Sequence, residues 1–262
     1  MDYLSNLNPH PKDKTLTFDE PSHVYTITRV DNNGNEYEDS GFTSVTTWNH
    51  SHFEGFDADK IIAKMMASRN WSNSKYYGMT PEEIKGGWEE NRNNAANAGT
   101  KMHNDIERFY NKLDVDNDSI EYKWFLDFEK ERDIDLTPYR TEWMVYDEDV
   151  RIVGSIDMIF EKPDGTLVIY DWKRSKEIKK TNPWKSSHVS CISHLPDSNF
   201  WHYALQLNTY KTIIEKKYGK TVSGMYLVCL HPDNYNKSYQ RIEVPELRKE
   251  LTDLFDLRKE QI

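Results

Sequence analysis

The sequence predicts an α/β fold: a central mixed β-sheet flanked by helices, with a small N-terminal extension made of a β-hairpin and helices. Two features favour this class. Short runs rich in Ile, Val, Phe, Tyr and Trp are bounded by turn residues, and they lie between segments whose apolar residues recur at helical spacing. With 262 residues the chain can bury a sizeable core. We expect one compact domain, with residues 1–94 as the extension and residues 95–262 as the core.

The N-terminal part begins with a predicted hairpin. Alternation over residues 16–29 predicts a strand, Asn-Asn-Gly-Asn at 32–35 predicts a turn, and residues 36–45 are expected to pair back. This hairpin would serve as scaffold or as a flap that faces a substrate. Asp57 is expected to cap a helix, and the Thr-Pro-Glu-Glu sequence from Thr80 is a strong helix start.

Residues 97–113 predict a helix on which His103 and Glu107 lie one turn apart on the same face. An imidazole and a carboxylate placed in this way could complete the coordination of a cation that other residues hold. The alternative is that His103 is an ordinary surface or core histidine. Ser119 is expected to cap the next helix, and Pro138 to begin a strand that joins a central hairpin.

The central hairpin consists of residues 152–160 and 167–172, joined by the turn sequence Pro163-Asp164-Gly165. This turn would pair Lys162 with Thr166, and counting outward sets Asp157 opposite Asp171. Side chains opposite each other in an antiparallel pair share a face, so both carboxylates could hold one divalent cation.

Lys173 shares that face with Asp171, where it could stabilise charge developing on a phosphate. The alternative is an ordinary surface hairpin whose acids and lysine form a salt bridge. Asp157 argues against it, because it interrupts an apolar run in which a buried acid is costly without a partner.

The last third of the chain is expected to contain a long loop over residues 181–197 and a helix from Ser198 to Tyr218, on which Gln206 and Tyr210 lie one turn apart. A buried strand over residues 221–230 and an amphipathic helix that covers the sheet follow it.

Composition and charge limit the partners. The net charge of -10 argues against coating nucleic acid through bulk charge, and the longest apolar run is too short to cross a bilayer. The two cysteines are too few for a disulfide framework or an iron–sulfur cluster, so we expect a reducing, cytoplasmic location. Basic residues nevertheless crowd the stretch after Asp171, namely Lys173, Arg174, Lys176, Lys179, Lys180 and Lys185. This stretch is either a track that binds substrate or a charged segment exposed to solvent.

Four motifs between residues 99 and 210 resemble, in order and spacing, the RecB-type branch of the PD-(D/E)XK nucleases: Gly99-Thr100-x-x-His103-x-x-x-Glu107, Gly154-x-x-Asp157, Asp171-x-Lys173 and Gln206-x-x-x-Tyr210. The Phe-Thr-Ser-Val-Thr segment at 42–46 also resembles the phage and mitochondrial genome maintenance exonucleases of that superfamily. The motif's leading Pro is replaced by Ile156, as is common in this branch. The resemblance implies a restriction-endonuclease-like nuclease core.

The resemblance also implies a metal site for Mg²⁺ or Mn²⁺. His103, Asp157 and Asp171 would bind the metal through their side chains, and Trp172 through its backbone carbonyl. The cysteine set of the iron–sulfur relatives is absent, so no cluster is expected.

The other motif residues receive roles by the same resemblance. Lys173 would orient the nucleophilic water or stabilise the transition state, and Glu107 would help through water. Gln206 and Tyr210 would touch substrate or the catalytic lysine as supporting residues. Arg174 and Lys176 are expected to bind substrate because they belong to the basic stretch after the site.

The function implied is a metal-dependent deoxyribonuclease, an exonuclease on single-stranded or free-ended DNA in replication, recombination or repair. Its partners would be DNA and a replication or recombination protein, with no membrane, and the chain could be encoded by a phage or virus. Two alternatives stay open. Viral cap-snatching RNA endonucleases use a similar His, Asp, acid and Lys set. An inactive nuclease fold can also persist as a nucleic-acid-binding module, although such proteins usually lose a carboxylate or the lysine.

Overall fold

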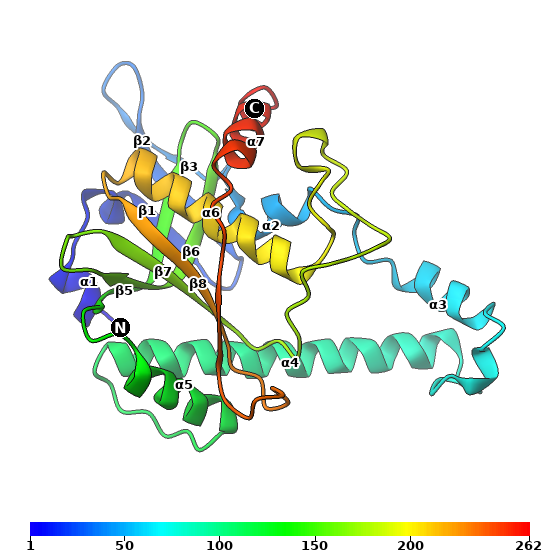
Figure 1. Ribbon diagram of the computed structural model, residues 1–262. Helices are drawn as coiled ribbons and strands as arrows, with labels where there is room; N and C mark the ends of the chain where they lie inside the picture. Colours follow the sequence, from blue (N-terminus) through cyan, green and yellow to red (C-terminus); the bar gives the residue numbers. More distant parts are fainter.

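The structure, a computed structural model, describes all residues from 1 to 262 (Figure 1). Its helices and strands follow in chain order: α1 (Tyr3–Leu7), η1 (Pro11–Thr15), β1 (Leu16–Asp19), β2 (Val24–Val30), β3 (Glu36–Asp39), β4 (Thr43–Ser44), α2 (Val45–His50), α3 (Ala58–Met66), η2 (Trp71–Asn73), α4 (Pro81–Tyr110), α5 (Ile120–Glu131), β5 (Thr137–Asp147), β6 (Ile152–Glu161), β7 (Leu167–Lys173), η3 (Ser190–Ile192), α6 (Asn199–Lys217), β8 (Val222–Cys229), β9 (Gln240–Glu243) and α7 (Arg248–Lys259).

The main sheet has six strands. Five of them follow the order β4-β6-β7-β8-β9, and the sixth, β5, pairs with β6 along the edge opposite β4 and β7. The sheet is mixed, as predicted: β5, β6 and β7 are antiparallel neighbours, whereas β7 and β8 run parallel. The predicted turn is confirmed. Lys162 and Thr166 pair through a 2.9 Å hydrogen bond from the Lys162 N–H, and Gly165 adopts φ +78°. A side chain at that backbone angle would be strained.

β6 changes partner along its length. Its C-terminal half pairs with β7 as far as Met158 and Tyr170, whereas Ile152 and Val153 pair with β4. Between these two ladders β6 and β7 separate, and Asp157 is the first β6 residue past the last pair. The functional groups described below gather at this split.

Helices cover both faces of the sheet. On β7, Leu167 and Ile169 pack into the core under α2, α6 and α7, whereas Val168, Tyr170 and Trp172 pack into the core under α4 and α5 (Figure 1). Burial on both faces explains why residues 167–170 of this strand are all apolar or aromatic instead of alternating with polar residues. By the same alternation, Asp171 and Lys173 belong to the α6 face.

The N-terminal hairpin is more divided than predicted. The strand expected over residues 16–29 is broken by a turn, because His23 adopts φ +54° and Asp19 accepts the Ser22 N–H, so β1, β2 and β3 form a three-stranded meander. The second expected strand, residues 36–45, also divides. β3 pairs with β2, but β4 joins the main sheet beside β6.

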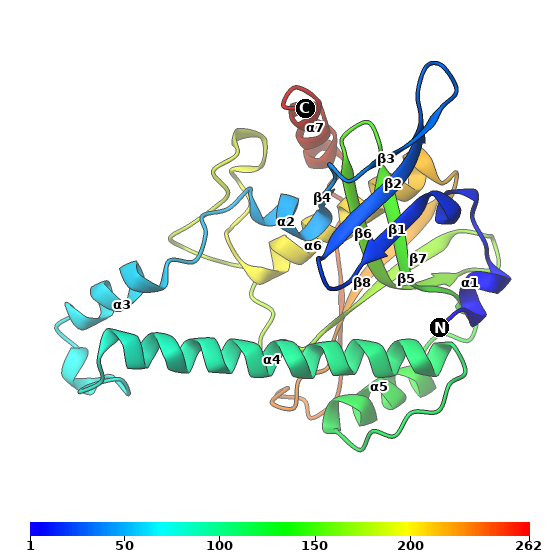
Figure 2. The same cartoon turned by 180° about the vertical axis from the view of Figure 1, so that it is seen from behind.

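Helix α4 begins as predicted, with a capping box in which Thr80 and Glu83 each accept the other's backbone N–H. It continues without a break to Tyr110 and therefore includes the helix expected from residue 97, and the division suggested between residues 94 and 95 falls inside it. Its N-terminal half extends away from the sheet, beside α3 (Figures 1 and 2).

No helix in the chain combines the length and the hydropathy needed to cross a bilayer.

Candidate metal and phosphodiester site

The first two groups of the site lie where β6 and β7 separate. The observed register agrees with the count from the turn, since Met158 pairs with Tyr170 and the next position places Asp157 beside Asp171. One oxygen of Asp157, Oδ2, accepts the backbone N–H of Trp172 at 2.9 Å. The Trp172 backbone is therefore at the site, and metal binding by its carbonyl stays a prediction.

Two further side chains, one from α4 and one from β5, converge on Asp157. His103 Nδ1 of α4 lies 3.5 Å from Asp157 Oδ2 and 3.9 Å from Glu142 Oε1 of β5. One ligand atom from each of the three lies within 4.8 Å of the other two, close enough to hold a metal ion together. An imidazole and carboxylates are ligands that suit Mn²⁺, and carboxylates also suit Mg²⁺.

Glu142 was not foreseen from the sequence. It is the only acid between Pro138 and Tyr146, and the β5–β6 register, in which Thr141 pairs with Met158 and Trp143 with Ile156, places it opposite Asp157. An acid directly before the aromatic and apolar run at residues 143–146 was an available signal. Its partner depended on a pairing that the sequence does not reveal.

The backbone at Glu142 is strained. Its φ is +43°, a left-handed conformation that costs a non-glycine residue about 1–3 kcal/mol. The side chain is held in place because Ser155 Oγ donates to its Oε2 at 2.8 Å. Such strain concentrates at functional sites, where the surrounding structure holds a side chain in a needed direction.

Asp171 and Lys173 of β7 form a buried ion pair next to Asp157, and Asp171 is not among the three converging ligands. Lys173 Nζ lies 2.6 Å from Asp171 Oδ2, and it also lies over the ring of Tyr203 at 4.4 Å. Asp171 is 2% exposed, and apart from this ion pair its Oδ2 has no hydrogen-bond donor. The Lys173 ammonium is therefore the one polar partner of this buried carboxylate oxygen within the chain.

The charges of the site are coupled. Burial raises the pKa of Asp171 to about 6 against the opposing effect of Lys173. Burial lowers the pKa of His103, but Asp157 and Glu142 outweigh it and raise this pKa to about 9. Burial likewise opposes the charge on Lys173, whereas Asp171 and Asp157 raise its pKa to about 12. At neutral pH the metal-free site therefore holds two protonated cations among its carboxylates.

We expect Mn²⁺ binding near pH 7.5 to release about one proton per ion, because His103 must lose its proton before Nδ1 can bind the metal. The pKa of His103 is raised, so the apparent affinity should climb about tenfold per pH unit from pH 7 and level off near pH 9. Calorimetry in Tris and in HEPES, whose ionisation enthalpies differ, measures the released protons. A His103→Ala variant should bind more weakly without this pH dependence; equal proton release by both proteins would contradict the assignment.

The supporting residues lie around this centre. Glu107 points into the cavity that His103 and Glu142 line, and burial together with Glu142 raises its pKa to about 7. Gln206 and Tyr210 contact each other, with Nε2 3.4 Å from the hydroxyl. Tyr210 also explains Gly154, because a Cβ at that position would lie 3.0 Å from the tyrosine ring.

The basic stretch after the site is largely neutralised by neighbouring acids. Arg174 Nε donates to Glu121 at 2.7 Å, and Lys176 pairs with Asp233 at 3.2 Å. Lys185 pairs with Glu54 at 2.7 Å. The structure thus places Arg174 in a half-buried ion pair, whereas Lys176 stays exposed next to the strand that carries Asp171.

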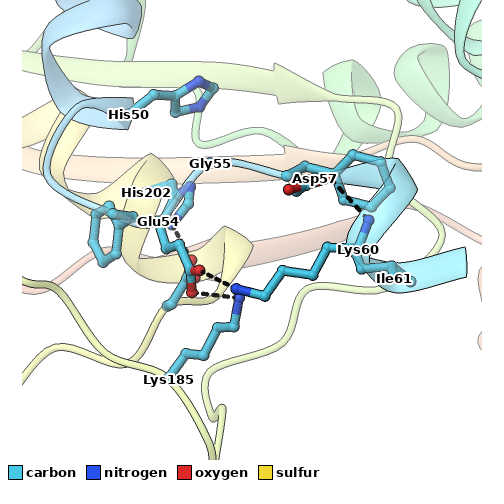
Figure 3. Close-up of a pocket in the computed structure, with 11 residues that line it drawn as sticks. His50, Glu54, Gly55, Asp57, Lys60, Ile61, Lys185 and His202 are labelled. Atoms are coloured by element: carbon cyan, nitrogen blue, oxygen red, sulfur yellow. Dashed lines mark hydrogen bonds and ion pairs between the residues drawn. The ribbon is translucent and has the colours of Figure 1, made fainter. Parts of the chain in front are cut away.

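A second cavity, of about 380 Å³, lies away from the site between the start of α3 and the loop before α6 (Figure 3). Glu54 bridges Lys60 and Lys185 there, and Asp57 accepts the Lys60 N–H to cap α3, as predicted. Its ionisable groups thus pair with each other. They tie the segment after α2 to the long loop, and no cation site with three converging ligands forms there.

Comparisons with known proteins gave a family match and a weak structural likeness. A family model described as PD-(D/E)XK nuclease superfamily matches residues 118–261, a range that holds Glu142, Asp157, Asp171 and Lys173. A solved structure described as "Crystal structure of SSO0001" is similar at 14% identity and a TM-score of 0.33, covering 86% of this chain and 77% of that one. No curated protein matches.

Proposed function

The chain belongs to the PD-(D/E)XK nuclease superfamily, whose members are typically metal-dependent nucleases, and from this premise we propose that it is a Mg²⁺- or Mn²⁺-dependent deoxyribonuclease. The observation that carries the proposal is the convergence of His103, Glu142 and Asp157 beside the buried pair of Asp171 and Lys173. The carboxylates and the lysine of the motifs are all retained, which favours an enzyme over a binding module that has lost its activity.

In this proposal His103, Glu142 and Asp157 would hold the cation, together with Asp171. When bound, the cation would supply Lewis acidity for phosphodiester hydrolysis. Hydrolysis joins a water oxygen to phosphorus and breaks one phosphorus–oxygen ester bond.

Lys173 has a pKa of about 12, so it remains an ammonium at neutral pH and cannot accept a proton from the attacking water. Its role is then to donate to a phosphoryl oxygen and to stabilise the negative charge that develops there. Glu107 has a pKa of about 7 and is partly ionised near neutral pH. We assign it to accept the proton of the attacking water, through an intervening water molecule.

The four motifs support a more specific proposal. The contact of Gln206 with Tyr210 next to Gly154 supports the RecB-type branch, and hence an exonuclease on single-stranded or free-ended DNA in replication, recombination or repair. We propose further that the protein acts in the cytoplasm and that a replication or recombination protein is its partner. We also propose that it is related to the phage and mitochondrial genome maintenance exonucleases. An RNA endonuclease of the cap-snatching type is the second candidate, since His103, two acids and Lys173 match that set as well.

The test is incubation of the chain with end-labelled linear DNA, circular single-stranded DNA and RNA of one sequence, each with Mn²⁺ and with EDTA. We expect Mn²⁺-dependent loss of the linear DNA and persistence of the circle and the RNA. Cleavage of RNA alone would favour the second candidate. Binding of any substrate without EDTA-sensitive cleavage would leave the binding module.

A further inference from the structure

A cavity of about 550 Å³ opens beside the metal-binding side chains. His103 and Glu142 line both the cation site and this cavity, so whatever enters it lies next to the reacting phosphate. The opposite wall comes from the N-terminal meander through Phe18, Glu20 and Tyr25. Figure 2 shows the turn between β1 and β2 directed toward α4. A segment more than 70 residues away in the sequence thus completes the site.

The wall is aromatic and still accessible. The Phe18 and Tyr25 rings pack with their centroids 4.4 Å apart and their planes at 31°, and His23 meets Phe18 edge-on at 5.1 Å. Phe18 and Tyr25 are half-buried and His23 is exposed, so their ring surfaces are not used up by the core.

The meander that carries these rings is anchored to the main sheet. Leu16 and Ile27, the first pair of the β1–β2 ladder, are buried in a small core with Tyr146 and Val153. The rings therefore project from a fixed support. A fixed support lowers the entropy lost when a ligand stacks on them.

The charges of the cavity decide which part of a nucleic acid fits there. The acidic and basic side chains that line it are Glu20, His103, Glu107 and Glu142, with no lysine or arginine among them. Carboxylates repel phosphate, so an additional backbone phosphate is disfavoured. An uncharged, flat ring is favoured, because aromatic side chains stack on every base regardless of sequence.

We propose that Phe18 and Tyr25 form a stacking subsite for one unpaired nucleobase adjacent to the scissile phosphate. This subsite rests on the proposed nuclease function, and it would position the substrate nucleotide for cleavage. A base within a duplex is already stacked on both faces and paired on its edge, so only a single-stranded or frayed nucleotide can enter. The subsite thereby selects unpaired substrate, with Phe18 and Tyr25 as positioning residues.

The test scans one abasic position at a time through a single-stranded oligonucleotide and measures kcat/KM. For the unaltered chain, one abasic position next to the cleaved bond should lower kcat/KM about tenfold. Phe18→Leu, which stays apolar and loses the ring, should lower kcat/KM on intact substrate about tenfold and be insensitive to that position. Phe18→Trp should restore both properties. Tyr37→Leu is the matched control, because Tyr37 lies in the same meander, 43% exposed and outside the cavity.

A second readout separates this inference from the proposed function. Quenching of 2-aminopurine in the oligonucleotide is measured in EDTA, where no cleavage occurs, and it should be lost in Phe18→Leu and kept in Tyr37→Leu. If the unaltered chain quenches but does not cleave, the nuclease proposal fails and the subsite stands. If Phe18→Leu quenches and cleaves as the unaltered chain does, or keeps the same abasic penalty, the subsite is overturned.

Discussion

Replacing Lys173 with alanine is expected to lower the cleavage rate by about 10²-fold or more, which amounts to loss of activity. The affinity for Mn²⁺ should stay equal or rise slightly. Lys173 Nζ lies 2.6 Å from Asp171 Oδ2 and carries a charge that would repel an incoming cation. Its removal therefore costs the contact to the phosphate but not a metal ligand. Asp157→Ala and Asp171→Ala should abolish cleavage and weaken Mn²⁺ binding as well, because each removes a carboxylate. Single-turnover cleavage and calorimetry measure the two effects separately.

The control is Lys162→Ala, at the far end of the same hairpin, where the Lys162 backbone closes the turn. It should cleave and bind Mn²⁺ as the unaltered chain does. Removing Lys173 also leaves the buried Asp171 without its partner, so this variant should be less stable without metal and gain more in Tm on adding Mn²⁺. Near-normal cleavage by Lys173→Ala, or full Mn²⁺ affinity in Asp157→Ala, would refute the arrangement proposed for the site.

Replacing Glu142 is expected to separate stability from metal binding. Glu142→Gly and Glu142→Ala should both lower Mn²⁺ affinity about tenfold or more, since each removes one of three converging ligands. The free energy of unfolding of the glycine variant should nevertheless be about 1 kcal/mol higher than that of the alanine variant. The glycine variant is the more stable one because only glycine adopts φ +43° without strain. Urea titrations of both variants in EDTA measure the difference, and calorimetry measures the affinity.

Glu243, an exposed residue at the end of β9, provides the reversed control. Its backbone has no positive φ, so Glu243→Gly should be less stable than Glu243→Ala by about 0.5–1 kcal/mol. The same order at both positions would show that the backbone at Glu142 is not strained. Unchanged Mn²⁺ affinity in Glu142→Ala would remove this residue from the ligand set.

Local sequence patterns determined the parts of the site that depend on near neighbours. The turn Pro163-Asp164-Gly165 sets its own hairpin register, and this register alone places Asp157 beside Asp171. The capping box at Thr80 likewise marked the start of α4. Such features depend on backbone angles and hydrogen bonds within a few residues, so they can be read without knowing the rest of the fold.

The N-terminal segment shows where local reading reached its limit. Residues 16–29 alternate as one strand would, yet the left-handed His23 breaks them into β1 and β2, and β4 leaves the hairpin for the main sheet. Which strands pair with each other depends on how their apolar faces pack in the folded protein. This packing is determined by the whole chain and not by the residues of one strand.

By itself, the sequence determined the α/β class, the hairpin with Asp157, Asp171 and Lys173, and the helical face that carries His103. Only the tertiary structure decided that Glu142 converges with His103 and Asp157, and that Phe18 and Tyr25 close the adjacent cavity. The physical reason is distance along the chain. These contacts join β1, β2, α4, β5 and β6 through the pairing of separate strands and the packing of a helix across them, and no spacing within one segment encodes them.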